Sequence, residues 1–355
     1  MDTIKLIIPS DIPHNCQIIT GFLRLEEQGQ AVEITDISRN AANPFYDLPV
    51  VLAEYRGKRI VYDLWDGYQN PEGMQKGLDA CDFYFKRSFS AEKNAALFPA
   101  DAEKMYPLGF NYHVTHRKNP INEPLWKSML KPLLGRAPDR YFVTEVFEGS
   151  APQKGDGPVK ILFLTQLWDD QDPTLPPELN HERTLINEMR VEIIRALRRQ
   201  YGDAFVGGLN NCGLSRRLAP ELIVPTNYTE RRKYLKLLHS CDICIGSMGL
   251  HESIGWKTAE YVAAAKAIVN ENFHYSVPGN FDQGRNFLAF STAPECIDAV
   301  QQLVESPEML YAMKLANEDY YRNFLKPEVL VKNSLNTVDR ALSQPMEETH
   351  NTGPQ

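Results

Sequence analysis

The stretch of residues 241–271 constrains the fold of this chain more than any other part of the sequence. Its hydrophobic pattern predicts a buried strand at 242–247, a glycine-containing loop at 248–255, a helix at 256–266 and a second apolar strand at 267–269. A strand, a loop, a helix and another strand in this order are typical of a parallel sheet covered by helices. Similar alternation elsewhere in the chain indicates an α/β fold.

Two glutamates, Glu252 and Glu260, stand eight residues apart in this stretch. Glu252 falls in the loop and Glu260 falls just over one turn into the helix, with the start of the helix between them. The first N–H groups of a helix lack intrahelical partners, and the helix dipole favours an anion there. A loop carboxylate can accept hydrogen bonds from sugar hydroxyls, and a helical one can reach a ribose diol. The arrangement suits a sugar diphosphate, whereas two solvated surface glutamates are the simpler alternative.

The run ESIGWKTAE at residues 252–260 resembles the E-G-F-G-L-x-x-x-E signature of retaining, nucleotide-sugar-dependent glycosyltransferases of GT-B fold, a group that includes bacterial glycogen synthase. Both glutamates, Gly255 and the apolar residues beside it match that signature. The following AAAKAIVNE resembles the A-x-A-x-G-x-P-V-V of the family. Ser253 and Lys266 stand where the family usually carries glycines. The resemblance covers the C-terminal half by sequence and the N-terminal half by architecture alone.

The resemblance implies a GT-B architecture, in which two Rossmann-like domains face each other across a cleft. We expect an acceptor-binding domain at residues 1–150 and a nucleotide-sugar-binding domain at 151–330. Residues 331–355 would form a helix that returns to the first domain, followed by a disordered tail. The polar run GSAPQKGDGP at 149–158 is the best candidate for the linker between the domains.

The resemblance also implies roles for the residues of the motif. Glu252 would bind the sugar ring and Glu260 the ribose. The backbone amides of Ser253, Ile254 and Gly255 would hold the diphosphate. The reaction would move a sugar from a nucleotide-sugar donor to a hydroxyl of a glycan or small-molecule acceptor, with retention of anomeric configuration. No metal ion and no cofactor is expected.

Positive charge must neutralise the diphosphate as it leaves. The family uses a G-R…K-G pattern for this purpose, and that pattern is not visible here. Arg183 and Lys257 are the replacement candidates, although Arg183 could equally be a surface arginine in an ion pair. Thr165 and Gln166 follow the apolar run VKILFL, and so lie at the end of a predicted strand where a nucleotide would pass.

The N-terminal half begins with an apolar run of strand length at residues 4–8, a loop, and a predicted helix at 17–28. In GT-B enzymes the loop after the first strand faces the cleft. By that analogy His14 becomes a candidate on the acceptor side. A loop histidine without chemistry is an equally good interpretation.

Composition excludes several classes of protein. A formal net charge of −8 argues against a general nucleic-acid-binding surface. No apolar run reaches the length of a membrane span, so we expect a cytoplasmic protein with at most peripheral membrane contact. Cys241 and Cys244 form a C-x-x-C, but no second ligand pair accompanies it, so we predict reduced thiols rather than a zinc site.

Two other functions remain open at this point. A GT-B relative could bind a nucleotide-sugar without transferring the sugar, as a nucleotide-sugar epimerase does. Alternatively, the missing basic motif could belong to a catalytically silent protein that binds a glycan or a nucleotide.

Overall fold

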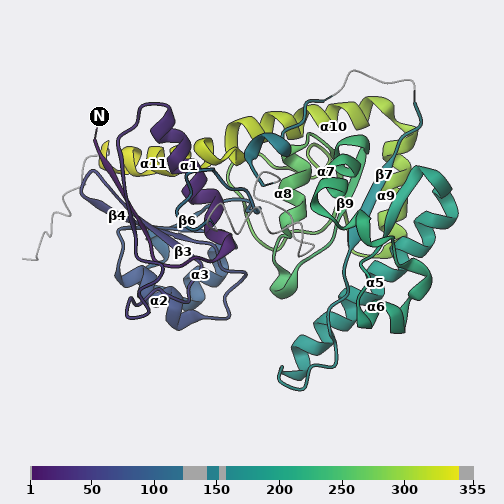
Figure 1. Cartoon of the computed structure of the whole chain (residues 1–355), viewed down its shortest axis with the longest axis horizontal. Coiled ribbons are helices and arrows are strands. Elements are labelled where there is room, and N and C mark those ends of the chain that lie inside the picture. The colour runs from purple at the N-terminus through teal and green to yellow at the C-terminus, as the bar shows by residue number, and fades with distance from the viewer. Residues whose placement is uncertain (1, 123–141, 152–156, 344–355) are drawn as a thin grey trace, which may run out of the picture.

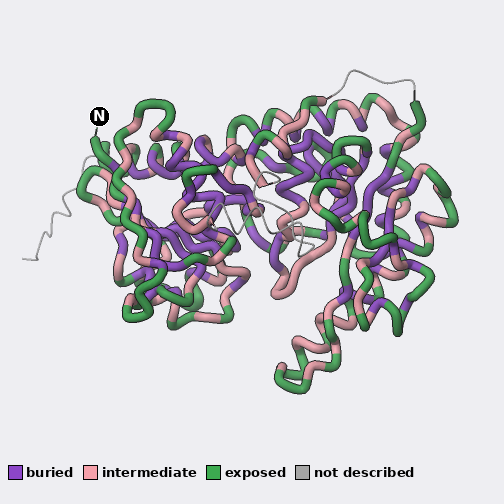
Figure 2. Tube along the Cα trace, viewed as in Figure 1, coloured by how far each residue is buried: buried purple, intermediate pink, exposed green. Residues whose placement is uncertain are grey.

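Two separate β-sheets organise the chain, one in each half of the sequence (Figure 1). The computed structural model describes residues 2–122, 142–151 and 157–343. Each sheet carries helices on its faces, so the fold is α/β with two Rossmann-like domains, as the sequence predicts. Figure 2 shows buried strands inside both domains and exposed outer faces of the helices. The domain boundaries given above stay a prediction, and the tail at 344–355 lies outside the described residues.

The N-terminal sheet has six strands in the order β2-β1-β3-β4-β5-β6. Strand β3 runs antiparallel to both of its neighbours, and the other pairs are parallel. Arg56 and Gly57, both with positive φ, form the two-residue turn between β3 and β4. The strands are β1 (Ile4–Ile8), β2 (Val32–Asp36), β3 (Val50–Tyr55), β4 (Lys58–Asp63), β5 (Phe83–Lys86) and β6 (Met105–Pro107).

Helices cover both faces of this sheet. Helices α1 (Cys16–Glu27) and α11 (Pro327–Ser343) share one core with β1, and α2 (Pro71–Asp79) and α3 (Ala91–Leu97) lie on the other side. Figure 1 shows α11, at the C-terminal end of the described chain, beside α1. Gly21 permits this contact, because a Cβ there would lie 2.4 Å from the carbonyl oxygen of Pro327.

The C-terminal sheet is fully parallel, in the order β11-β10-β9-β7-β8. The strands are β7 (Ile161–Thr165), β8 (Phe205–Leu209), β9 (Ile243–Gly246), β10 (Ala267–Glu271) and β11 (Leu288–Phe290). The helices of this half are α5 (Pro177–Tyr201), α6 (Gly213–Leu218), α7 (Arg231–Ser240), α8 (Trp256–Ala263), α9 (Ala293–Glu305) and α10 (Pro307–Tyr320). The predicted strand, loop, helix and strand of residues 241–271 are all present.

Helix α8 ends three residues earlier than the sequence pattern predicts. Ala265 has a left-handed conformation (φ 52°), which stops the helix. Lys266 is buried and donates hydrogen bonds to the carbonyl oxygens of His239 and Cys241, at 2.9 and 2.8 Å. The lysine therefore joins the end of α7 to the start of β10.

Within the described ranges, no helix is both long and apolar enough to cross a membrane.

Candidate functional site

A cavity of about 480 Å³ lies at the carboxyl ends of β7 and β9. The chain passes from β7 to β8 on one side and returns to β9 on the other, so the connections diverge at this point. In open α/β sheets this crossover is where ligands bind. Four segments of the C-terminal domain and two single residues form the cavity walls. The segments are residues 163–168 without Leu167, 228–234 in part, 245–249 and 255–260 without Ala259, and the single residues are Arg190 and Asn210.

Half of the ten residues proposed from the sequence line this cavity. They are Thr165, Gln166, Gly255, Lys257 and Glu260. The other five, His14, Arg183, Glu252, Ser253 and Ile254, are not among its lining residues. The cavity therefore contains five of the nucleotide-side candidates, but neither the loop carboxylate Glu252 nor the Ser253 and Ile254 amides proposed for the diphosphate, and all of these roles stay predictions.

Lys257 is the cation at the start of α8. Its Nζ donates to the carbonyl oxygen of Leu164 at the end of β7 and lies 5.4 Å from the centre of the Tyr234 ring. Burial lowers the pKa of Lys257 to about 8, against the opposing effect of Glu260. A buried ammonium of this kind is stabilised by an anionic ligand, because the ligand restores the charge balance lost with water.

Glu260 is buried and has both carboxylate oxygens engaged. Its Oε1 accepts from Arg231 Nη1 at 3.0 Å, and its Oε2 accepts from the Tyr234 hydroxyl at 2.6 Å. Arg231 also lies over the Phe147 ring, 4.5 Å from its centre. A ribose diol at this site would therefore have to share Glu260 with α7 or displace its partners.

Arg190 is a cavity residue that the sequence analysis missed. It is buried on α5, and its guanidinium donates to Gln166 O (2.6 Å), Ser247 Oγ (2.9 Å) and Met248 O (2.9 Å). It thereby joins the loops that follow β7 and β9. Burial lowers the pKa of Arg190 to about 10, so the side chain stays charged at neutral pH. A signal was present, because Arg190 interrupts the buried apolar stripe of α5 formed by Ile186, Ile194 and Leu197.

Positive charge dominates the walls of the cavity. Lys257, Arg190 and Arg231 face a single lining carboxylate, Glu260, although the whole chain has a formal net charge of −8. Gly255 is the N-cap of α8, and no side chain caps this helix end. Cations with low-dielectric walls and an uncapped helix start favour an anion in the cavity.

Glu252 lies outside the cavity, at the contact between the two domains. His251 and Glu252 both adopt left-handed backbone conformations (φ 61° and 60°), and their N–H groups donate to Glu182 Oε1 at 2.7 and 3.4 Å. The Glu252 carboxylate is paired with Lys93 of α3, with 3.0 Å between Nζ and Oε2. His274 Nδ1 lies 3.6 Å from the other oxygen. The carboxylate expected to bind the sugar thus has protein partners here.

The N-terminal domain makes further contacts with the loop at residues 248–255 and with the segment that follows β10. Arg87 Nη2 donates to the carbonyl oxygen of Ile254 at 2.6 Å. A β-bridge joins Phe89 to Ser276, whose N–H donates to Phe89 O at 2.9 Å. Arg87 and the Lys93 pair contact residues 248–255 directly, whereas the Phe89 bridge joins the N-terminal domain to the segment after β10.

His14 lies beside the cavity wall. Its ring packs edge-on against Trp256, with 4.7 Å between ring centres, and Trp256 lines the cavity. Burial and the nearby Arg87 lower the pKa of His14 to about 4, so its imidazole is neutral at pH 7. Within the described chain, His14 Nδ1 and the neighbouring Asn15 Oδ1 and Asn111 Oδ1 are buried without hydrogen-bond partners. Ordered water is the partner that enclosed polar atoms of this kind commonly have.

The two remaining candidates have their hydrogen-bonding groups occupied in part. Arg183 Nη1, on α5, donates to the carbonyl oxygen of Asp169 at 2.6 Å. The N–H of Ser253 donates to Leu250 O at 3.2 Å. Of the three amides proposed for the diphosphate, that of Ser253 therefore already has an acceptor.

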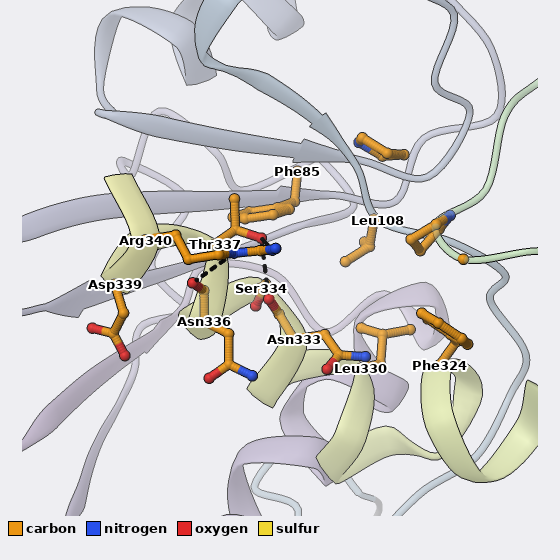
Figure 3. Close-up of a pocket in the computed structure, with 13 residues that line it drawn as sticks. Phe85, Leu108, Phe324, Leu330, Asn333, Ser334, Asn336, Thr337, Asp339 and Arg340 are labelled. Atoms are coloured by element: carbon orange, nitrogen blue, oxygen red, sulfur yellow. Dashed lines mark hydrogen bonds between the residues drawn. The ribbon is translucent and has the colours of Figure 1, made fainter. Parts of the chain in front are cut away.

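A larger cavity of about 700 Å³ lies between the edge of the N-terminal sheet and α11 (Figure 3). Several of its polar side chains already have hydrogen-bond or ion-pair partners within the protein. Arg340 donates to Thr337 Oγ1 at 3.1 Å, and Asp339 is paired with Arg56 at 3.0 Å. None of its lining residues carries a buried polar atom without a partner among the described residues. The cavity at β7 and β9 is therefore the better candidate site.

No group of three or more His, Cys, Asp or Glu residues in the described segments could hold a metal ion. Cys241 and Cys244 are separate, buried thiols. Burial raises the pKa of Cys241 to about 11, so it is protonated at neutral pH.

A scan against protein-family models finds no match, and a search of curated proteins finds none either. Among solved structures, HepE from Anabaena in complex with UDP is 11% identical with a TM-score of 0.44, over 96% of this chain and 100% of that one. S. aureus MnaA with UDP is 11% identical with a TM-score of 0.48, over 96% of this chain and 97% of that one. Sucrose-phosphate synthase from Thermosynechococcus elongatus is 12% identical with a TM-score of 0.37, over 92% of each chain. At these scores none of them assigns a residue role to this chain.

Proposed function

We propose that this chain is a GT-B glycosyltransferase that moves a sugar from a nucleotide-sugar donor to a hydroxyl of a glycan or small-molecule acceptor. The observation that carries the proposal is the cavity at β7 and β9, where Lys257 and Arg190 lie beside the uncapped start of α8. A nucleoside diphosphate is an anion of the size and charge that such a crossover site accepts.

The proposed chemistry depends on neutralising the leaving group. As the bond between sugar and diphosphate breaks, negative charge grows on the diphosphate oxygens. Lys257 and the start of α8 would stabilise this charge. Arg190 would add its charge while it holds the two loops in place. Retention of configuration and independence from metal ions follow from the motif resemblance and are part of the proposal.

The acceptor would bind on the side of the N-terminal domain. His14 supports this location, because its neutral imidazole packs on Trp256 of the cavity wall. Glu252 would exchange Lys93 for a hydroxyl of the donor sugar. A cytoplasmic location belongs to the same proposal.

A binding protein without catalysis is the second candidate, and the pairing of Glu252 with Lys93 favours it. If Glu252 stays paired, the sugar loses its expected carboxylate. The Glu252→Ala and Glu260→Ala variants separate the two functions. A transferase loses turnover in these variants, whereas a silent binding protein keeps its biological activity.

The first experiment is a thermal-shift panel of UDP-, GDP-, ADP-, CMP- and TDP-sugars. A ligand that binds only the folded state raises the melting temperature by mass action. We expect one nucleotide class to raise it. The ligand found is then incubated with the protein alone and with candidate acceptors. Epimerisation of the donor without acceptor would indicate an epimerase, and a panel without any shift would contradict the proposal.

A further inference from the structure

Arg87 of the N-terminal domain reaches the loop at residues 248–255 in the C-terminal domain. It directly follows β5, and its backbone N–H donates to Asp63 O at the end of β4, at 2.9 Å. Its side chain is only 4% exposed. Nη2 of its guanidinium donates to the carbonyl oxygen of Ile254 at 2.6 Å, and Nη1 is paired with Asp66. Because both arms of this rigid fork are engaged, the guanidinium is held in one orientation.

The carbonyl oxygen of Ile254 belongs to the same peptide unit as the N–H of Gly255. This peptide bond is trans. A trans peptide unit is planar, so its C=O and N–H groups point in opposite directions. Since Arg87 holds the oxygen on the side of the N-terminal domain, the N–H of Gly255 points to the opposite side.

The N–H of Gly255 is available to a ligand. Gly255 lines the cavity, is partly exposed and has backbone atoms only. Its carbonyl oxygen accepts from the N–H of Thr258 at 3.1 Å, in the first turn of α8. No acceptor for the N–H of Gly255 is found within residues 2–122, 142–151 and 157–343. An anion at the start of α8 can therefore accept from it.

The orientation of this peptide unit needs a hold from outside the loop, because residue 255 is glycine. Gly255 has a φ of −64°, but glycine adopts positive φ about as readily. The peptide unit can therefore turn over, which would move its N–H away from the cavity. Turning it over would break the charge-assisted hydrogen bond from Arg87 to Ile254 O. The arginine thus stabilises the orientation that suits a ligand.

We propose that Arg87 is a positioning residue for the diphosphate site. Arg87 does not line the cavity. It acts by keeping the peptide unit between Ile254 and Gly255 in the orientation that directs the N–H at a diphosphate oxygen, and Asp66 holds its guanidinium in place. This inference rests on the proposed function. It means that an anion site walled by the C-terminal domain depends on a side chain of the N-terminal domain.

Two variants with opposite changes in charge separate positioning from simple attraction. Arg87→Met removes a positive charge, and Asp66→Asn removes a negative one. If both groups acted on the anion through their charge alone, Asp66→Asn would bind it more tightly than the wild type. A positioning role predicts weaker binding in both variants. Lys93→Met is the matched control, because Lys93 is a cation of the same domain that contacts the same loop through the Glu252 side chain and not through a peptide group.

Two measurements are made on each protein. Calorimetry gives the dissociation constant of pyrophosphate, or of the tightest of UDP, GDP, ADP and CDP if pyrophosphate binds too weakly to measure. NMR of protein labelled with ¹⁵N-glycine follows the amide of Gly255, whose signal is the one missing from the spectrum of Gly255→Ala. An amide proton that donates to a phosphate oxygen moves downfield, so this signal reports the proposed hydrogen bond.

We expect the downfield shift of the Gly255 proton in the wild type at saturating ligand. Arg87→Met should bind the ligand about tenfold more weakly and lose the shift. Asp66→Asn should bind about threefold more weakly with a smaller shift, and Lys93→Met should match the wild type. If Arg87→Met does not fold, Asp66→Asn decides alone, since Asp66 is 37% exposed and its replacement leaves the core intact.

Four results would each overturn the inference and leave the proposed function in place. They are wild-type affinity in Arg87→Met, wild-type or higher affinity in Asp66→Asn, an equal loss of affinity in Lys93→Met, and a Gly255 shift that is absent from the ligand-bound wild type or unchanged in ligand-bound Arg87→Met. Failure of the wild type to bind pyrophosphate and all four nucleoside diphosphates would overturn both the inference and the proposed function.

Discussion

Lys93 Nζ lies 3.0 Å from Oε2 of Glu252, and this ion pair joins the two domains. The side chains are 42% and 44% exposed, so water screens the pair. Exposed ion pairs of this kind contribute about 0–1 kcal/mol to stability. Separating Lys93 from Glu252 therefore costs little, and a sugar hydroxyl can replace the ammonium as the partner of the carboxylate.

The variant Lys93→Met tests this exchange. We expect the melting temperature to change by no more than about 4–8 °C, since a 60–100-residue domain shifts that much per 1 kcal/mol and larger domains shift less. Removing the competing ammonium should strengthen binding of the nucleotide-sugar relative to its nucleoside diphosphate, as measured by calorimetry. Lys93→Arg keeps the pair and serves as the control. An unchanged ratio of the two affinities in Lys93→Met would show that Glu252 does not bind the sugar.

The variant Lys257→Met should stabilise the ligand-free protein at pH 7. A folded-state pKa of about 8 means that folding disfavours the charged lysine. The difference from the ordinary lysine pKa corresponds to a destabilisation of about 3 kcal/mol, at about 1.4 kcal/mol per pKa unit. Loss of the hydrogen bond to Leu164 O offsets about 1 kcal/mol of the gain.

The pH dependence of this effect has a definite sign. The penalty of the charged lysine is complete below pH 8 and disappears as the pH rises through the unfolded-state value of about 10.4. Urea unfolding of the wild type and Lys257→Met at pH 7 and at about pH 10.5 measures it. A variant that is less stable than the wild type at pH 7 would contradict the burial of a charged amine.

Gly255→Ala separates folding from ligand binding. Gly255 has an ordinary φ of −64°, and the only atom within 4 Å of an added Cβ is Ser247 O, at 3.5 Å. The variant should therefore fold with a stability within about 1 kcal/mol of the wild type, because the reduced freedom of the unfolded chain is opposed by the poorer preference of Ala for an N-cap position. The methyl group would occupy space at the start of α8, so we expect weaker binding of pyrophosphate by calorimetry. Full affinity in Gly255→Ala would indicate that the anion binds elsewhere.

Arg190 and Arg183 lie on the same helix and make a matched pair. Arg190→Met removes three hydrogen bonds from a buried site and should destabilise the protein by about 2–4 kcal/mol in urea unfolding. It should also weaken anion binding. Arg183→Met removes a contact to Asp169 O outside the cavity and should change stability by less than about 0.5 kcal/mol. Equal losses of anion affinity in both variants would favour the role first predicted for Arg183.

Periodicity and strand order explain what the sequence could predict. The hydrophobic pattern of residues 241–271 changes from that of a strand to that of a helix and back. The order of β9, α8 and β10 therefore follows from the local pattern alone. Thr165 and Gln166 could be assigned to the site because the carboxyl ends of strands in a parallel sheet meet at one edge. These inferences need no knowledge of distant contacts.

Contacts between distant residues explain what the sequence could not predict. Arg231 contacts Glu260, which lies 29 residues away in the sequence, and Lys93 contacts Glu252, which lies 159 residues away. Such pairs depend on how helices pack, which no local pattern encodes. Arg190 is different, because a charged residue within a buried helical stripe is visible in the sequence once the helix is placed.

The central claim is that the cavity at β7 and β9 binds the diphosphate of a nucleotide through Lys257. Calorimetry of a nucleoside diphosphate with the wild type and Lys257→Met tests it most directly. We predict one binding site in the wild type, an affinity about tenfold or more lower in the variant, and wild-type binding that weakens as the pH rises through about 8 and the lysine loses its proton. Equal affinity of both proteins, without this dependence on pH, would contradict the claim.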